Sequence, residues 1–470
     1  MAGVSSCSHD WLDVEPSTSI ETDKSVTTLA DVSFVLNGIY SDMQSSNAYS
    51  GRLIYYGDAT GDDMQAISPT KRVANYYRFN WTADNGPSTH WSYLYSIITS
   101  CNVILNKIDN ISVLEDEKEE RDDYKGQALA IRGMAYFDLT RIFGYPYLKD
   151  NGASLGVPLV LNPTDINNKP ARATVAQCYE QIVKDLKEST TLLKGDFNKG
   201  KYNRWAALTL LSRVYLYQGK NAEALQAAQQ AIEGAEGAGY ALWTNEEYPT
   251  AWGNDASESR PGEVLLEVVN LTTDSPGKES MGYLSSPKGY RDIGITVSFY
   301  HLLKQDPNDV RLKLITFYKK SEAYMNKYQP QEGEDIADAN IPLIRLSEAY
   351  LNAAEAAVKL NDNANAVKYL NPIVQRANPA NSVEGKTLTL DDVLTERRKE
   401  LVDEGHRMFD VLRNGLTVKR VDETDSGLST KHNTKYMEFN WDFYLCVLPI
   451  PKHEINANSN IEQNPGYSKN

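Results

Sequence analysis

The sequence lacks any apolar run long enough to cross a membrane as a helix. Such a helix needs about 20 consecutive apolar residues, and the longest candidates, such as residues 155–161, are short and contain Gly and Pro. The sequence has no stretch rich in Lys and Arg. It contains 48 Lys and Arg and 63 Asp and Glu, which gives a net charge of −15. Because nucleic-acid binding needs a basic face, we expect no nucleic-acid partner.

The usual catalytic motifs are also absent. The sequence contains no GxSxG, HExxH, P-loop or GxGxxG motif, and its six histidines are not spaced as metal ligands. We therefore expect no catalytic residues, no metal site and no cofactor. A pair of carboxylates acting as in glycosidases leaves no motif, so a surface glycosidase stays an alternative.

Cysteine is scarce, with four residues and no CxxC pair. Cys101 and Cys178 lie in apolar helical patterns and are expected to be buried thiols. Cys7 ends the segment 4–7 (VSSC), where an aliphatic and two small residues precede the cysteine as in a bacterial lipoprotein signal. We expect lipidation at Cys7, with residues 1–15 forming a truncated signal and a polar tether.

Aromatic residues are present in an unusual ratio, 29 Tyr and 7 Trp against 10 Phe. A buried tyrosine needs a hydrogen-bond partner for its hydroxyl, so a core uses Phe at least as readily. The excess of Tyr and Trp favours half-exposed aromatics, as on a binding surface. Tyr-rich helix packing accounts for a part of them.

Helical periodicity dominates the chain. Residues 204–233 show two apolar faces joined at Gly219, and residues 346–376 repeat the pattern with Asn361 in the turn, where it can take a left-handed conformation. Such helix pairs with small residues at the contact match the tetratricopeptide pattern. Further helices are expected at 27–43, 91–111, 123–143 and 174–193, of which the last two form a split pair.

The predicted fold is therefore mainly α, a tetratricopeptide-like scaffold with long irregular loop insertions. We assign residues 16–470 to one domain. Its helical repeats lie at about 27–46, 91–233 and 342–415. Loops at about 47–90 and 234–340 are rich in Gly, Pro, Asn and aromatic residues, and loops of this length are usually functional. They are expected to form a ligand-binding half.

Four segments resemble the SusD/RagB family in the order that the family shows. They are 128–147 (ALAIRGMAYFDLTRIFGYPY), 343–357 (LIRLSEAYLNAAEAA), 395–415 (TERRKELVDEGHRMFDVLRNG) and 448–467 (LPIPKHEINANSNIEQNPGY). The Glu-Gly-His-Arg run and the closing Pro-Ile-Pro…Asn-Pro-Gly-Tyr are the most specific parts. From its periodicity, 395–415 is expected to form a helix with ion-pair ladders, in which His406 serves packing.

The resemblance implies a function without chemistry. Members of this family are outer-membrane lipoproteins at the cell surface, held by a lipid anchor. They cover a SusC-like TonB-dependent transporter and deliver oligosaccharides, or less often peptides, to it. We therefore expect a non-enzymatic glycan-binding protein, with a peptide-binding member of the family as the main alternative.

The ligand is expected to meet two irregular segments, 58–91 and 240–291. Flat aromatic rings stack on the apolar faces of sugars, and Asp, Asn and Arg bind the hydroxyl groups. The first segment offers Asp63, Arg72, Tyr77, Trp81 and Asn85, and the second offers Trp252, Tyr283, Tyr290 and Arg291. Trp81 is predicted to be an exposed stacking residue at a loop tip. The Gly-Tyr pairs at 282–283 and 289–290 likewise favour loop tips.

Overall fold

The computed structural model describes residues 26–162, 169–254 and 262–468. Predicted elements in residues 1–15, including Cys7, lie outside this part of the chain. The longer helices are α1 (Leu29–Gln44), α4 (Thr89–Leu105), α5 (Lys118–Phe143), α7 (Val175–Leu192), α8 (Arg204–Gln218), α9 (Asn221–Gly237), α13 (Leu346–Lys359), α14 (Asn363–Ala377) and α15 (Leu390–Glu400). The mainly helical fold that the sequence predicts is confirmed.

Short helices and strands occupy the connections. The short helices are α2 (Arg52–Ala59), α3 (Ala74–Tyr77), α6 (Tyr147–Asp150), α10 (Ala251–Asn254), α11 (Met281–Leu284), α12 (Val297–Lys304), α16 (Arg407–Arg413) and α17 (Lys452–Ala457). The strands are β1 (Met64–Ala66), β2 (Val264–Val268), β3 (Ile293–Ile295), β4 (Ile315–Tyr318), β5 (Glu322–Met325), β6 (Ile341–Arg345), β7 (Val418–Lys419), β8 (Glu423–Asp425), β9 (Leu428–Thr430) and β10 (Glu438–Phe439).

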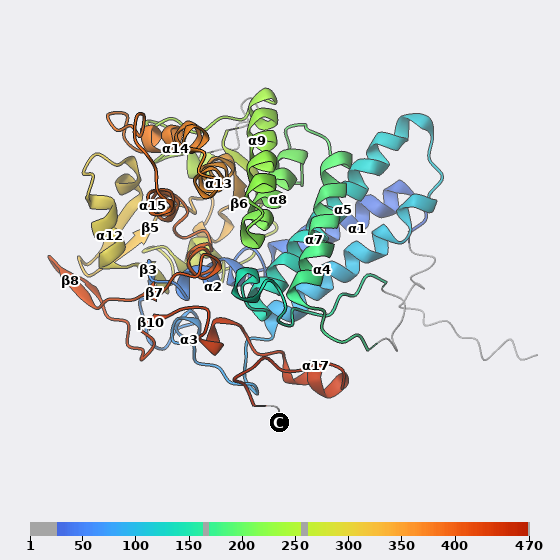
Figure 1. Ribbon diagram of the computed structural model, residues 1–470, viewed down its shortest axis with the longest axis horizontal. Helices are drawn as coiled ribbons and strands as arrows, with labels where there is room; N and C mark the ends of the chain where they lie inside the picture. The colour runs from blue at the N-terminus through green and yellow to red at the C-terminus, as the bar shows by residue number, and fades with distance from the viewer. Residues whose placement is uncertain (1–25, 163–168, 255–261, 469–470) are drawn as a thin grey trace, which may run out of the picture.

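Helices α4, α5 and α7 pack side by side at one end of the molecule, with α1 against α4 (Figure 1). Arg132 of α5 holds them together, because its Nε and Nη2 donate to the Asp185 carboxylate of α7 at 2.8 and 2.7 Å and its Nη1 donates to Asn102 of α4 at 2.9 Å. A buried arginine needs such partners. The split pair predicted from 123–143 and 174–193 is thus a packed pair, α5 with α7.

The two unsplit helix pairs begin and end where their turn residues indicate. Asn203 caps α8 by accepting hydrogen bonds from the backbone N–H groups of Trp205 and Ala206. Gly219 ends the helix at φ 71°, and Asn361 between α13 and α14 has φ 60°, as predicted. Helix α13 also packs on α9, so the two pairs form one stack.

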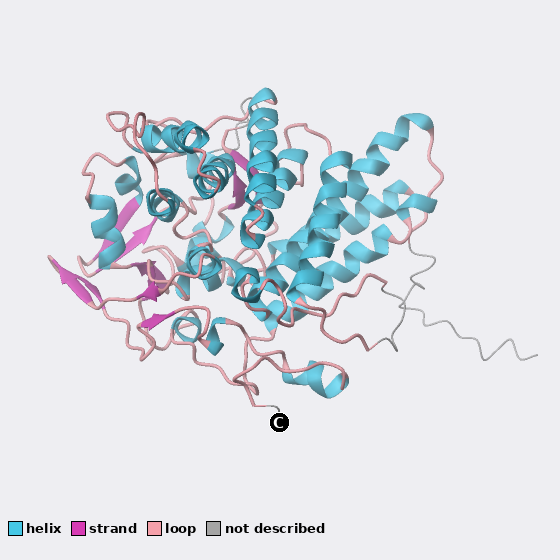
Figure 2. Ribbon diagram, in the orientation of Figure 1, coloured by secondary structure: helices cyan, strands magenta, loops and turns pink. Residues whose placement is uncertain are grey.

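Most of the paired strands lie at the opposite end from α4, α5 and α7, while β6 lies nearer the middle beside α8 (Figure 2). The strands form two-stranded antiparallel ladders, β1 with β3, β2 with β6, β4 with β5, β7 with β10 and β8 with β9. In the part of the chain that the structure covers, no helix is both long and apolar enough to span a membrane.

Candidate functional site

Pairing of β1 with β3 brings the two predicted ligand-binding segments together. Met64 lies opposite Ile295 and Ala66 opposite Ile293 in this antiparallel ladder. Beyond the ladder, the Ile67 N–H donates to the Asp292 carbonyl at 3.0 Å. Residues that follow β1 therefore lie beside residues that precede β3. Strand β5 packs on β3 and carries its hairpin partner β4 to the same place.

Three half-buried tyrosines and two arginines gather there, and we name this group the tyrosine face: Tyr283, Tyr290, Tyr318, Arg72 and Arg291. The rings of Tyr283 and Tyr290 meet edge to face, with centroids 4.8 Å apart. The Arg72 guanidinium carbon lies 4.0 Å from the Tyr290 ring centroid, and that of Arg291 lies 3.9 Å from the centroid of Tyr318. All five side chains are part-exposed, so they offer both ring surface and hydrogen-bond donors to a ligand.

One buried carboxylate and two part-exposed or exposed charged side chains hold Arg72 and Tyr290 in place. The fully buried Asp292 forms ion pairs with Arg72 and Lys71, each at 3.2 Å. The Lys71 ammonium also donates to the Tyr290 carbonyl. Glu279 accepts from the Arg72 Nε at 2.5 Å. Because these bonds fix the arginine, its remaining donors are pre-organised for a ligand.

The backbone of this loop allows little change. The Tyr290 N–H donates to the Tyr283 carbonyl at 2.8 Å, and a Cβ at Gly289 would lie 2.1 Å from that same carbonyl oxygen. Arg291 has φ 54°, a left-handed conformation that is costly for a residue with a Cβ and is often found at functional sites. The glycine and the turn therefore set where Tyr290 and Arg291 lie.

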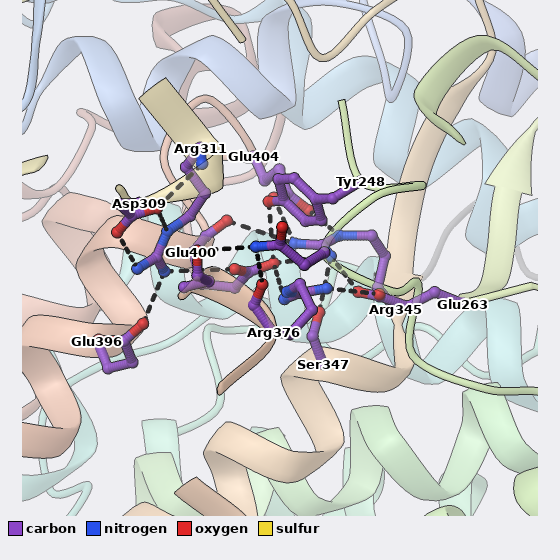
Figure 3. A network of polar contacts seen from close by, with 12 residues as sticks. Tyr248, Glu263, Asp309, Arg311, Arg345, Ser347, Arg376, Glu396, Glu400 and Glu404 are labelled. Carbon is purple, nitrogen blue, oxygen red and sulfur yellow. Dashed lines mark hydrogen bonds and ion pairs between the residues drawn. The ribbon is translucent and has the colours of Figure 1, made fainter. Parts of the chain in front are cut away.

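A large network of buried charges forms a second polar cluster, which shares no residue with the tyrosine face. Figure 3 shows Glu400 surrounded by arginines. Its carboxylate lies 2.8 Å from Arg376 Nη2, 3.1 Å from Arg345 Nη1 and 3.4 Å from Arg311 Nη1. Burial acts to raise the pKa of Glu400, but the arginines outweigh it and lower this pKa to about 2. The network joins α14, α15, β6 and the segment before β4, which marks it as part of the scaffold.

The segment 395–415 is not the single helix that the periodicity predicts. Helix α15 ends at Glu400 and α16 begins at Arg407, because Asp403 and Gly405 between them take left-handed conformations with φ 65° and 81°. Most of its charged side chains form ion pairs with residues of other elements, as Glu400 does. They do not form a ladder of pairs along one helix.

Two carboxyl groups with clearly raised pKa values, those of Asp58 and Asp403, lie inside the protein. Burial raises the pKa of Asp58 to about 7, and burial together with the charge of Asp58 raises that of Asp403. A raised carboxyl pKa suits a general acid, yet both side chains are fully buried and neither belongs to the tyrosine face. His406 is buried as well. Its pKa is lowered mainly by burial and further by the positive charge of nearby arginines. These groups serve the packing of the 401–406 turn.

Comparison with known proteins decides the family. The profile described as "SusD family" matches residues 304–467, and one described as "Starch-binding associating with outer membrane" matches residues 10–216. A crystal structure of a SusD superfamily protein from Bacteroides vulgatus ATCC 8482 is 38% identical, with a TM-score of 0.88, 94% of this chain covered and 100% of the other. The chain belongs to the SusD family.

Other members are similar over nearly their whole length. A candidate sugar-binding protein from Bacteroides vulgatus ATCC 8482 is 72% identical, with a TM-score of 0.94 and with 95% of this chain and 100% of the other covered. SusD-like protein P38 of Formosa agariphila is 23% identical over 89% of this chain and 92% of its own length. The family resemblance seen in the sequence is thereby confirmed.

The prediction that Trp81 is an exposed loop-tip residue of this SusD-family protein is wrong. Its side chain is only 6% exposed. The indole Nε1 donates to the Tyr467 hydroxyl at 2.9 Å, and the ring packs against Tyr76 and Phe79. The sequence carries a signal of this burial, because Tyr76, Phe79 and Trp81 lie close together in the chain and form one aromatic cluster.

Tyr77 and Trp252 are also buried, with 1% and 5% of each residue exposed. Tyr77 stacks on His432 with ring centroids 5.5 Å apart, and its hydroxyl bonds the histidine Nδ1. Trp252 lies under two buried cations, with the Lys327 ammonium and the Arg345 guanidinium each 4.8 Å from its ring. Neither ring is presented for stacking on a ligand.

Asp63 is buried and paired with arginines, while Asn85 is exposed and caps a turn elsewhere. The Asp63 carboxylate accepts from Arg398 Nε at 2.6 Å and lies 3.1 Å from Arg407 Nε. The Asn85 amide oxygen accepts from the Thr82 N–H at 2.7 Å, which caps a turn. Of the nine predicted binding residues, Arg72, Tyr283, Tyr290 and Arg291 come together. Tyr318 was not among the residues predicted from the sequence. The only local feature that indicates an exposed position for it is the Phe-Tyr-Lys-Lys run at a hairpin tip.

No cluster of His, Cys, Asp and Glu within the described residues is arranged to hold a metal ion. Cys101, Cys178 and Cys446 are free and buried, and burial raises the pKa of each thiol. A buried thiol with a raised pKa is a poor nucleophile and a poor metal ligand. These cysteines therefore serve as small core residues.

Proposed function

We propose that this SusD-family protein binds a glycan on the tyrosine face and delivers it to a SusC-like TonB-dependent outer-membrane transporter. The observation that carries the proposal is the gathering of three part-exposed tyrosines and two arginines from three separate segments. Aromatic rings offer flat apolar surface to the C–H faces of a sugar, and guanidinium groups donate to its oxygens. No covalent chemistry is part of this proposal.

The relatives support a sugar as the ligand and the outer membrane as the location. The 72% identical chain is described as a candidate sugar-binding protein, and the family profile over residues 10–216 is described as starch-binding and associated with the outer membrane. Lipidation of Cys7 would hold the protein at that membrane. The signal-like segment 4–7 is the basis for this part of the proposal.

A glycan array with the soluble protein identifies the ligand, and calorimetry on tyrosine variants then locates it. Tyr290→Ala is expected to weaken binding at least tenfold, because truncation of an aromatic anchor often costs about 2 kcal/mol. Tyr290→Phe, which keeps the ring, should retain most of the affinity. Phe34→Ala is the matched control, since Phe34 is an aromatic of α1 that is 80% exposed and far from this face in the sequence.

Two results would contradict the proposal. If Tyr283→Ala, Tyr290→Ala and Tyr318→Ala all bind the identified glycan like the unmodified protein, the tyrosine face is not its site. If the array stays blank while peptides bind in the same calorimeter, the protein is a peptide-binding member of the family. Turnover of oligosaccharides by the purified protein would instead establish the glycosidase alternative.

A further inference from the structure

We infer that the tyrosine face selects a negatively charged glycan, one that carries carboxylate or sulfate groups. This inference rests on the proposed function and specifies the class of sugar. Its starting point is the positive local charge around the tyrosine face, which contrasts with the net charge of −15 of the whole chain. Exposed charges farther apart than about 8 Å are largely screened at physiological salt, so a ligand responds to this local charge.

Five cations touch the three tyrosines. The Lys278 and Lys319 ammonium groups lie 5.4 and 5.2 Å from the rings of Tyr283 and Tyr318. The guanidinium groups of the tyrosine face lie on the rings of Tyr290 and Tyr318, and a lysine binds the carbonyl of Tyr290. These cations are Lys71, Arg72, Lys278, Arg291 and Lys319.

The carboxylates that form ion pairs with these five cations are fewer than the cations. Those that pair with the five cations are Glu279, Asp292 and Glu322, so five positive charges face three negative charges. Within the described residues Lys278 and Lys319 have no ion pair, and both are exposed. Two positive charges are therefore left for a ligand.

Arg291 is also only loosely held. Its Nε lies 3.8 Å from Glu322, a long ion pair, while the Glu322 carboxylate accepts a hydrogen bond from the Tyr324 hydroxyl. The Arg291 side chain is 32% exposed. A guanidinium group with free donors binds a carboxylate or a sulfate through two parallel hydrogen bonds.

The geometry suits a sugar that stacks and carries a charge at its edge. A cation lies over each of the three rings, and all three tyrosines are part-exposed, so a pyranose would contact the exposed part of a ring beside a cation. A carboxylate or sulfate at the rim of that pyranose would then lie near the lysines and Arg291. A neutral sugar would stack equally well but would leave the excess positive charge without a partner.

The test compares each charged glycan with its own neutral derivative. The array should contain neutral glucans, polygalacturonate and chondroitin sulfate, together with carboxyl-reduced and desulfated forms of the charged polymers. We expect calorimetry to show binding of a charged form at least tenfold tighter than its neutral derivative at low salt, with the preference lost at about 0.5 M NaCl. Because chondroitin sulfate carries both a carboxylate and a sulfate, its desulfated and carboxyl-reduced forms are compared separately to identify which anionic group is preferred, and the form that lacks both groups is its neutral derivative; a preference for either group supports the inference.

Lysine variants link this preference to the tyrosine face. The double variant Lys278→Gln with Lys319→Gln should bind the charged glycan about tenfold more weakly, as expected for two exposed charge pairs. Lys220→Gln, an exposed lysine beside α9, is the matched control and should not change binding. Equal binding of charged and neutral forms, or no effect of the double variant, would overturn the inference. If neutral glucans bind and Tyr290→Ala removes that binding, the proposed function stands while the preference for anionic glycans fails.

Discussion

Replacing Trp81 tests the difference between a core aromatic and a binding aromatic. A tryptophan side chain buries about 150–250 Å², which corresponds to at most about 4–6 kcal/mol at roughly 25 cal/mol per Å². Trp81 is 6% exposed and its Nε1 bonds the Tyr467 hydroxyl. Because an alanine recovers part of the lost contact, we expect Trp81→Ala to cost about 3–5 kcal/mol.

The assay is thermal unfolding followed by calorimetric binding. The unfolding entropy of a chain of this length is about 1 kcal/mol per degree, so the Tm should fall by about 3–5 °C. Trp81→Phe keeps most of the packing and loses one hydrogen bond, which should cost about 1 kcal/mol. Glycan affinity per folded molecule should not change in either variant. A Trp81→Ala protein with unchanged Tm and lost glycan binding would refute the reasoning and restore Trp81 as a stacking residue.

Three further predictions address the buried charges and the lipid anchor. Glu400→Gln should lower the free energy of unfolding by about 3–5 kcal/mol in denaturant titrations, because it leaves buried arginines uncompensated; an unchanged midpoint would argue against the network. Asp58 has an ordinary pKa of 3.8 and a folded pKa of about 7, so its stabilisation is complete below pH 4 and falls by about 1.4 kcal/mol per unit up to pH 7. Asp58→Asn should lack this loss when Tm is followed from pH 4 to 8, and parallel curves would contradict the assignment. In a chain expressed with an export signal, Cys7→Ala should abolish lipid labelling and release the protein from the membrane; persistent labelling would exclude Cys7.

Helices were predictable from the sequence because their signals are local. The turn at Gly219 ends α8, and Asn361 takes the left-handed conformation that its position in the repeat predicts. Capping residues such as Asn203 act within three residues of the helix start. The exception is 395–415, where a helical charge pattern continues across a turn. Its charges pair with partners such as Arg345 and Arg311, which helical spacing cannot reveal.

The composition of the two loops predicts that aromatic residues and arginines bind a ligand. It does not identify which aromatic residues and which arginines do so. Tyr283 and Tyr290 follow glycines in a tight loop, a local feature, and the structure places both in the proposed site. Tyr318 joins them only because β5 packs on β3 and brings β4 along. Arg72 reaches Tyr290 because β1 pairs with β3, more than two hundred residues later.

Burial decided the remaining assignments, and burial is a property of the tertiary structure. The sequence by itself determined the long helices of the repeats, the turns at Gly219 and Asn361, and the family. It did not reveal that Trp81 meets Tyr467 or that Trp252 lies under Lys327 and Arg345. An aromatic residue in an irregular segment has the same local sequence whether a distant segment covers it or not. Only the packing of those distant segments determines which rings remain free to bind.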